Sequence, residues 1–142
     1  MSRTTEIRAA LVARLVAAAP GAAVAASSIA WENKKFNPAT GTRYYRATFL
    51  PGEPFAAGIG ETAPDRYSGI FQIDVFESAD KGDGPAAIEA ERIAACYKRD
   101  TALVYSGVTV RCVKAYRSVG NSDDPAWFMV SVVVRWTADV AN

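Results

Sequence analysis

Residues 127–136 constrain the fold most, because apolar side chains recur there at every second position. An extended chain places alternate residues on opposite faces. One face would carry Phe128, Val130, Val132, Val134 and Trp136, and the other Met129, Ser131, Val133 and Arg135. An unbroken apolar face of this length indicates a strand packed against a core. The segment therefore predicts a central β-strand.

Weaker patterns predict the remaining elements. Residues 29–36 and 44–50 read as extended segments around turn chemistry at 37–41, which favours a β-hairpin. Residues 67–76 and 108–116 predict two more strands, the second paired with 127–136 through a polar turn. Residues 51–66 hold three prolines and three glycines, and a stretch this long without an element is typical of a functional or mobile loop.

Two amphipathic helices are expected. The first follows Thr4 as N-cap and ends before Pro20. Its apolar residues recur at helical spacing, interrupted by charged side chains, so we interpret it as a helix and not as an export signal or a membrane span. The second opens at Gly84-Pro85. Its buried stripe is expected to be Ala86, Ala90, Ile93 and Tyr97.

This order of elements predicts a fold class. We expect one α+β domain over residues 1–142, with an antiparallel sheet of four to five strands and two helices packed on one face. The opposite face would carry Ile70, Phe76, Met129 and Val133 among polar groups. That mixture favours contact with another protein. Scattered surface apolar residues are the alternative reading.

Composition removes several classes of function. Lys plus Arg number 16 against 15 Asp plus Glu, so no global basic field attracts nucleic acid. The histidine count is zero, which excludes His-based catalytic triads and His-ligated metals. Cys96 and Cys112 lack zinc-site spacing and are expected to be buried thiols, with a disulfide as the alternative. No cofactor, metal or catalytic residue is predicted.

Isolated candidate motifs have structural explanations. Gly58-Ile59-Gly60 resembles part of a nucleotide-binding loop, but no strand leads into it and no helix follows. Glu89 and Glu91 point to different sides of a helix, so they are expected to be solvated. Asp74 is expected to form an ion pair across the sheet with Arg111 or Arg135.

Charges are segregated along the chain. Basic residues gather on the predicted first hairpin, and acidic residues follow the strand over 67–76. Two readings stay open: solvated surface charges, or a basic hairpin that meets the acidic segment of a neighbouring subunit. With exposed apolar positions, the candidate interface residues are Lys34, Lys35, Arg43, Arg46, Phe55, Ile59, Ile70, Phe76, Glu77, Asp80 and Asp83.

The sequence resembles a small family of bacteriophage tail terminator proteins between Ile7 and Trp136. The shared opening motifs are IAWEN at residues 29–33, FNP at 36–38 and LP at 50–51. YSGIFQIDVF at 67–76 resembles the family's core strand, and GVTVR at 107–111 with WF at 127–128 and Trp136 resembles its last hairpin. The order and spacing of these motifs carry the resemblance.

The resemblance implies a structural role in the virion of a long-tailed phage or prophage. Such a protein forms a ring, commonly of six subunits, on the head-proximal end of the tail tube. The ring stops tube growth and offers a surface for head joining. The expected partners are further copies of the chain, the tail tube protein and a head-completion protein, with assembly in the bacterial cytoplasm. Another head-to-tail connector or small binding module is the alternative, and a small enzyme is less favoured.

Overall fold

The strand predicted from period-two alternation lies at the centre of the sheet. β7 (Trp127–Val140) pairs antiparallel along its whole length with β4 (Asp65–Ser78), and β6 (Val108–Arg117) pairs antiparallel on its other side. Val130, Val132 and Val134 are at most 1% exposed. The central position of this segment is therefore confirmed. The structure is a computed structural model that describes residues 3–39, 41–79, 82, 84–118, 120 and 126–141.

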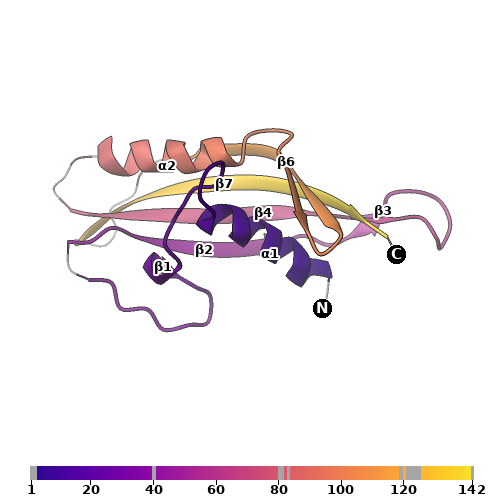
Figure 1. Cartoon of the computed structure of the whole chain (residues 1–142), viewed down its shortest axis with the longest axis horizontal. Coiled ribbons are helices and arrows are strands. Elements are labelled where there is room, and N and C mark those ends of the chain that lie inside the picture. The colour runs from indigo at the N-terminus through magenta and orange to yellow at the C-terminus, as the bar shows by residue number, and fades with distance from the viewer. Residues whose placement is uncertain are drawn as a thin grey trace.

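Seven strands form one sheet in the described part of the chain, in the order β1-β2-β4-β7-β6-β5, with β3 paired to β4 (Figure 1). The remaining strands are β1 (Ile29–Ala30), β2 (Tyr44–Pro51), β3 (Phe55–Ala56) and β5 (Ala102–Tyr105). The prediction of four to five strands is wrong in number. β3 and β5 were missed because two to four residues show no readable alternation, and β1 is a short part of the extended segment predicted over residues 29–36.

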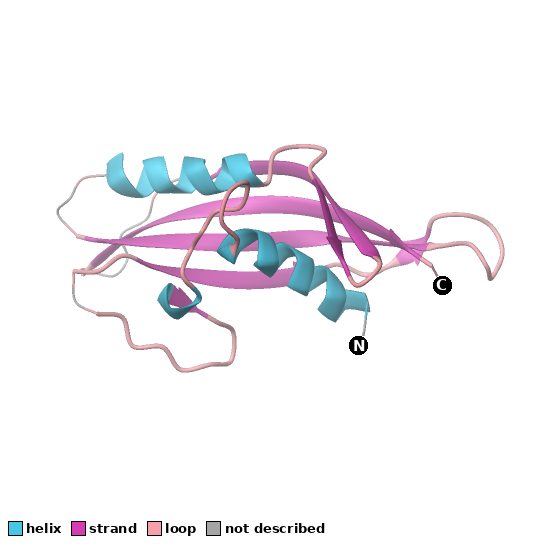
Figure 2. Ribbon diagram, in the orientation of Figure 1, coloured by secondary structure: helices cyan, strands magenta, loops and turns pink. Residues whose placement is uncertain are grey.

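Both helices cover the same face of the sheet, as predicted (Figures 1 and 2). α1 (Arg3–Val16) and α2 (Gly84–Cys96) close over the apolar sides of β4, β6 and β7, and a short 3₁₀ turn (Ala26–Ser28) precedes β1. The four residues of the predicted stripe from Ala86 to Tyr97 are fully buried. The Tyr97 hydroxyl donates to the Leu11 carbonyl at 2.7 Å, which links the two helices beneath the surface.

The predicted first hairpin does not form. β1 runs parallel to β2, with Ile29 opposite Tyr45, and residues 31–36 are not a strand. Two contacts redirect this segment: Arg8 lies 5.7 Å from the centre of the Trp31 ring, and Glu32 accepts a hydrogen bond from the Phe49 backbone N–H at 2.7 Å. Asn33 then adopts a positive φ of 53°, which ends the extended path.

Two smaller expectations are corrected. α1 begins at Arg3, so Thr4 lies inside the helix and is not its N-cap. The segment 51–66 is not an element-free loop, because β3 pairs with the start of β4 and the Ala57 N–H donates to the Pro64 carbonyl at 2.9 Å. Residues 55–66 thus form a hairpin, here called the tip hairpin, that extends beyond one end of the sheet (Figure 2).

Candidate functional site

One face of the sheet is covered by none of the described helices and offers an open candidate surface. Strand register places the side chains of this helix-free face in rows across β2, β4 and β7. Its members are Tyr44, Arg46, Thr48, Leu50, Ile70, Gln72, Asp74, Phe76, Met129, Ser131, Val133 and Arg135. The face divides into an aromatic end, a polar centre and an aliphatic end.

The aromatic end is closed by its own side chains. Tyr44 stacks on Phe76 with ring centroids 4.4 Å apart, and Trp127 meets Tyr44 edge-on at 4.9 Å. Arg46 covers the Phe76 ring at 5.2 Å. Phe76, a predicted interface residue, is consequently only 9% exposed. A partner at this end would meet the residues that cover Phe76 before the phenyl ring itself.

The polar centre is built around Asp74, a carboxylate that is only 1% exposed. It accepts hydrogen bonds from Arg46 Nε at 2.8 Å, Gln72 Nε2 at 2.9 Å and Ser131 Oγ at 2.6 Å. An ion pair across the sheet was predicted correctly, but the partners Arg111 and Arg135 were wrong. Strand register determines the partner of Asp74, because Arg46 of β2 lies directly opposite it.

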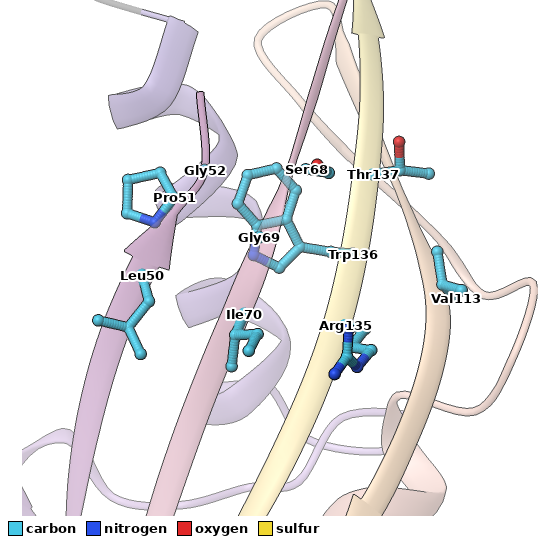
Figure 3. A pocket seen from close by; sticks show the side chains of 10 residues that line it. All are labelled: Leu50, Pro51, Gly52, Ser68, Gly69, Ile70, Val113, Arg135, Trp136 and Thr137. Carbon is cyan, nitrogen blue, oxygen red and sulfur yellow. The ribbon is translucent and has the colours of Figure 1, made fainter. Parts of the chain in front are cut away.

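The aliphatic end contains an open hollow of about 420 Å³ (Figure 3). Leu50, Ile70 and Arg135 stand side by side on neighbouring strands. Val113 joins them because a register shift between Cys112 and Lys114 leaves it as the extra residue of a β-bulge. Leu50 and Val113 are 48% and 46% exposed. This hollow, with these four side chains around it, is called the aliphatic hollow below.

The tip hairpin carries the most exposed large apolar side chain among the described residues. Ile59 is 102% exposed and Phe55 is 54% exposed. Arg66 donates two hydrogen bonds to Asp139, at 2.7 and 2.9 Å, where the hairpin joins the sheet. Both predicted apolar interface residues of this segment therefore lie accessible on a projection with an anchored base.

The predicted basic and acidic groups meet partly within one chain. Arg43 Nε lies 2.5 Å from Glu77 Oε2, so these two candidate interface residues pair with each other. Arg46 pairs with Asp74, as described above. Lys34 and Lys35 are exposed beside Trp31 and Phe36, with no ion pair among the described residues. Asp80 and Asp83 lie outside the described residues.

Glu89 was expected to be solvated, but it is 7% exposed and lies at the centre of a charged network. The Tyr45 hydroxyl donates to it, Arg92 Nε donates at 2.6 Å, and an Arg43 guanidinium nitrogen lies 3.5 Å away. Burial opposes ionisation of Glu89, but the hydrogen bonds from Arg92 and Tyr45 outweigh it and lower the pKa of Glu89. Sequence spacing could not reveal this network, because Tyr45 lies 44 residues away.

The pH dependence of stability tests this network. Burial and the bond to Glu89 raise the pKa of Tyr45 from 10.0 to about 12. A pKa that is higher in the folded state gives stability that is present below about pH 10, the unfolded value, and is lost as pH rises through the folded value. The free energy of unfolding of wild type, measured with urea, should therefore fall more steeply between pH 10 and 12 than that of Tyr45→Phe. Parallel pH profiles of the two proteins would contradict this assignment.

Other chemical sites are limited in the described part of the chain. Its Cys, Asp and Glu side chains form no group of three or more that could hold a metal ion. Both cysteines are free thiols; Cys112 is buried and Cys96 partly buried. Burial raises the pKa of Cys112 to about 11, which makes it a poor nucleophile near neutral pH. None of the described helices is long and apolar enough to cross a membrane.

The described residues form a helix-backed sheet with an open mixed face and an exposed apolar projection. The family model described as "Phage tail terminator protein" matches residues 6–136. The chain belongs to this family, which confirms the resemblance seen in the sequence. No curated protein matches the chain.

Two solved structures share the fold. One, whose title states no function, has a TM-score of 0.74 and 23% sequence identity, covering 100% of this chain and 99% of that chain. The other is a chain of a structure titled "Virion of native gene transfer agent (GTA) particle". It has a TM-score of 0.53 and 18% identity, covering 95% of this chain and 96% of that chain. These likenesses extend over nearly the whole length of all the chains compared.

Proposed function

We propose that the protein forms a ring, of six subunits, on the head-proximal end of a phage tail tube. The ring stops tube growth and presents a surface for head joining. The observation that carries this proposal is the family match over residues 6–136. The protein would be a virion component, assembled in the bacterial cytoplasm from a phage or prophage gene. The fold shared with a chain of a gene transfer agent virion supports this setting.

Termination requires binding without propagation. One ring face must match the last ring of the tube, while the other must lack what a further tube subunit needs. A closed ring of identical subunits uses two different patches of each chain. The helix-free face and the tip hairpin supply two such patches.

Electron microscopy of purified protein mixed with tail tubes tests the role. We expect density at one end of each tube and no further growth when tube protein is added. Native mass spectrometry of the capped species should give six copies per ring. Protein spread along the tube wall, or no binding, would contradict the proposal. Binding to head connectors but not to tubes would instead favour the alternative, another head-to-tail connector.

Exposed basic residues provide a mutational test of the ring. Lys34 and Lys35 are expected to meet acidic groups of a neighbour, because Arg43 and Arg46 already pair within the chain. Lys34→Glu with Lys35→Glu should weaken ring formation and leave the melting temperature unchanged. Each exposed pair contributes only about 0–1 kcal/mol, but a ring repeats it at every interface.

The matched control for this test is Lys98→Glu with Arg99→Glu, which makes the same change in net charge on exposed residues after α2. Ring yield should fall only in the Lys34 and Lys35 variant, and added salt should reproduce that fall in wild type. Equal yields for the two double variants in low salt would show that Lys34 and Lys35 are merely solvated.

A further inference from the structure

The tip hairpin and the aliphatic hollow are complementary surfaces of the same chain. Ile59 is an unburied apolar side chain at the end of a projection, with Gly58 and Gly60 on either side. The hollow is lined by Leu50, Ile70 and Val113, and its volume of about 420 Å³ accommodates an isoleucine side chain. One surface is a knob and the other is a hole of matching polarity.

Charge is also complementary. Residues 53–61, which lead into the tip hairpin and include its turn, contain Glu53 and Glu61 and no lysine or arginine. Arg135 lines the hollow, is exposed and has no ion pair among the described residues, and Lys114 lies opposite it on β6. The knob therefore carries acidic residues and the rim of the hole carries basic ones. Opposite charges of this kind on two surfaces orient the association of two molecules.

The hairpin cannot fill the hollow of its own chain. β3 pairs with β4 at Arg66 and Asp65, and the tip continues beyond these residues. The hollow lies in the opposite direction along β4, at Ser68 to Ile70. The Arg66–Asp139 contacts hold the base of the hairpin in that outward direction, and the tip points away from the sheet (Figure 1). The tip hairpin can therefore enter the hollow only of another molecule.

We propose that the tip hairpin of one subunit inserts Ile59 into the aliphatic hollow of a second copy of the chain. Knob and hole lie on different parts of each subunit, so the contact is heterologous and repeats from chain to chain. With the proper rotation, such a contact closes into a ring. The inference rests on the proposed ring function and names the contact that would build it.

Single variants test the two sides of the contact. Ile59→Asp on the knob and Val113→Asp in the hollow should each weaken self-association at least tenfold, since each places a charge in an apolar contact. Ile88→Asp is the matched control, because Ile88 is 70% exposed on α2, away from both surfaces. Sedimentation equilibrium measures the association, and thermal unfolding checks that all three variants remain folded.

Mixing the two defective variants gives a sharper result. A heterologous contact leaves one intact combination in the mixture: the wild-type knob of Val113→Asp with the wild-type hollow of Ile59→Asp. The mixture should therefore form dimers, and neither variant alone should do so. No chain extension or ring closure should follow, because the two surfaces left unoccupied in each dimer are the substituted knob and the substituted hollow. Failure to form these dimers would overturn the pairing of knob and hollow.

Binding to tail tubes separates this inference from the proposed function. If Ile59→Asp assembles on tube ends as wild type does, the inference is wrong and the terminator role stands. If Ile59→Asp retains self-association but loses tube binding, the knob contacts the tube protein and the inference is again wrong. If wild type ignores tubes yet self-associates through Ile59, the inference stands and the terminator role fails. No self-association of wild type, in solution or on tubes, would also overturn the inference.

Discussion

Replacing Trp136 with alanine is expected to lower the free energy of unfolding by about 3–5 kcal/mol, the range for removing a large aromatic side chain from a core. Trp136 is 1% exposed, and its ring stacks on Phe49 with centroids 5.5 Å apart and planes 9° apart. It lies on the central strand β7, opposite Gly69 of β4. Urea unfolding measures the loss, and Val104→Ala, at a position 70% exposed on β5, is the control for an apolar truncation.

Gly69 makes the position of the Trp136 ring possible. A Cβ added at Gly69 would lie 2.9 Å from Trp136 Cζ2 and 2.4 Å from the Leu50 carbonyl oxygen. Gly69→Ala should therefore cost about 1–3 kcal/mol through overpacking. The cost should fall in the Trp136→Ala background without vanishing, because the Leu50 carbonyl remains. Strict additivity of the two substitutions would show that the indole does not determine the need for glycine.

The parts of the fold that could be predicted are those in which one element carries its own signal. β7 shows ten successive residues of alternation, and the second helix combines Gly84-Pro85 with a helical apolar stripe. These patterns depend only on backbone periodicity and burial. Both predictions are confirmed for that reason.

Short elements carry no such periodic signal. β1 and β3 have two residues each and exist only because a longer neighbouring strand supplies their hydrogen bonds. β5 could have been found from Ser106-Gly107, since both residues adopt positive φ, at 52° and 83°, as the two-residue turns of tight hairpins require. That dipeptide lies between two apolar runs, which is the expected hairpin pattern.

The composition of the helix-free face could be predicted more readily than its ion pairs, and its role as an interface stays a prediction. The mixed character of the helix-free face followed from alternation in β4 and β7, and the exposure of Phe55 and Ile59 followed from a Gly/Pro-rich segment. The partners of Asp74 and Glu89 depend on register and on helix placement, which bring together residues 28 and 44 positions apart. The predicted first hairpin would pair β2 with residues 29–36, whereas β2 pairs along its whole length with β4 and so places Arg46 opposite Asp74.

The second large effect is expected at that pair. Arg46→Ala should lower the free energy of unfolding by about 1–3 kcal/mol, because the buried Asp74 carboxylate loses a charged donor although the Arg46 side chain itself is 50% exposed. Asp74, which is 1% exposed in the intact protein, would lose its cation, while Gln72 and Ser131 would still donate hydrogen bonds to it. The truncation would also uncover Phe76, which lies 5.2 Å beneath the guanidinium.

Arg135→Ala is the matched control, because Arg135 is exposed on the same face and has no ion pair among the described residues. Its unfolding free energy should stay within about 0.5 kcal/mol of wild type, as is usual for surface substitutions. The double variant Arg46→Ala with Asp74→Asn should be more stable than Arg46→Ala alone, because it removes the charge left without a partner. Equal losses for Arg46→Ala and Arg135→Ala would mean that solvent, not Arg46, stabilises the Asp74 carboxylate.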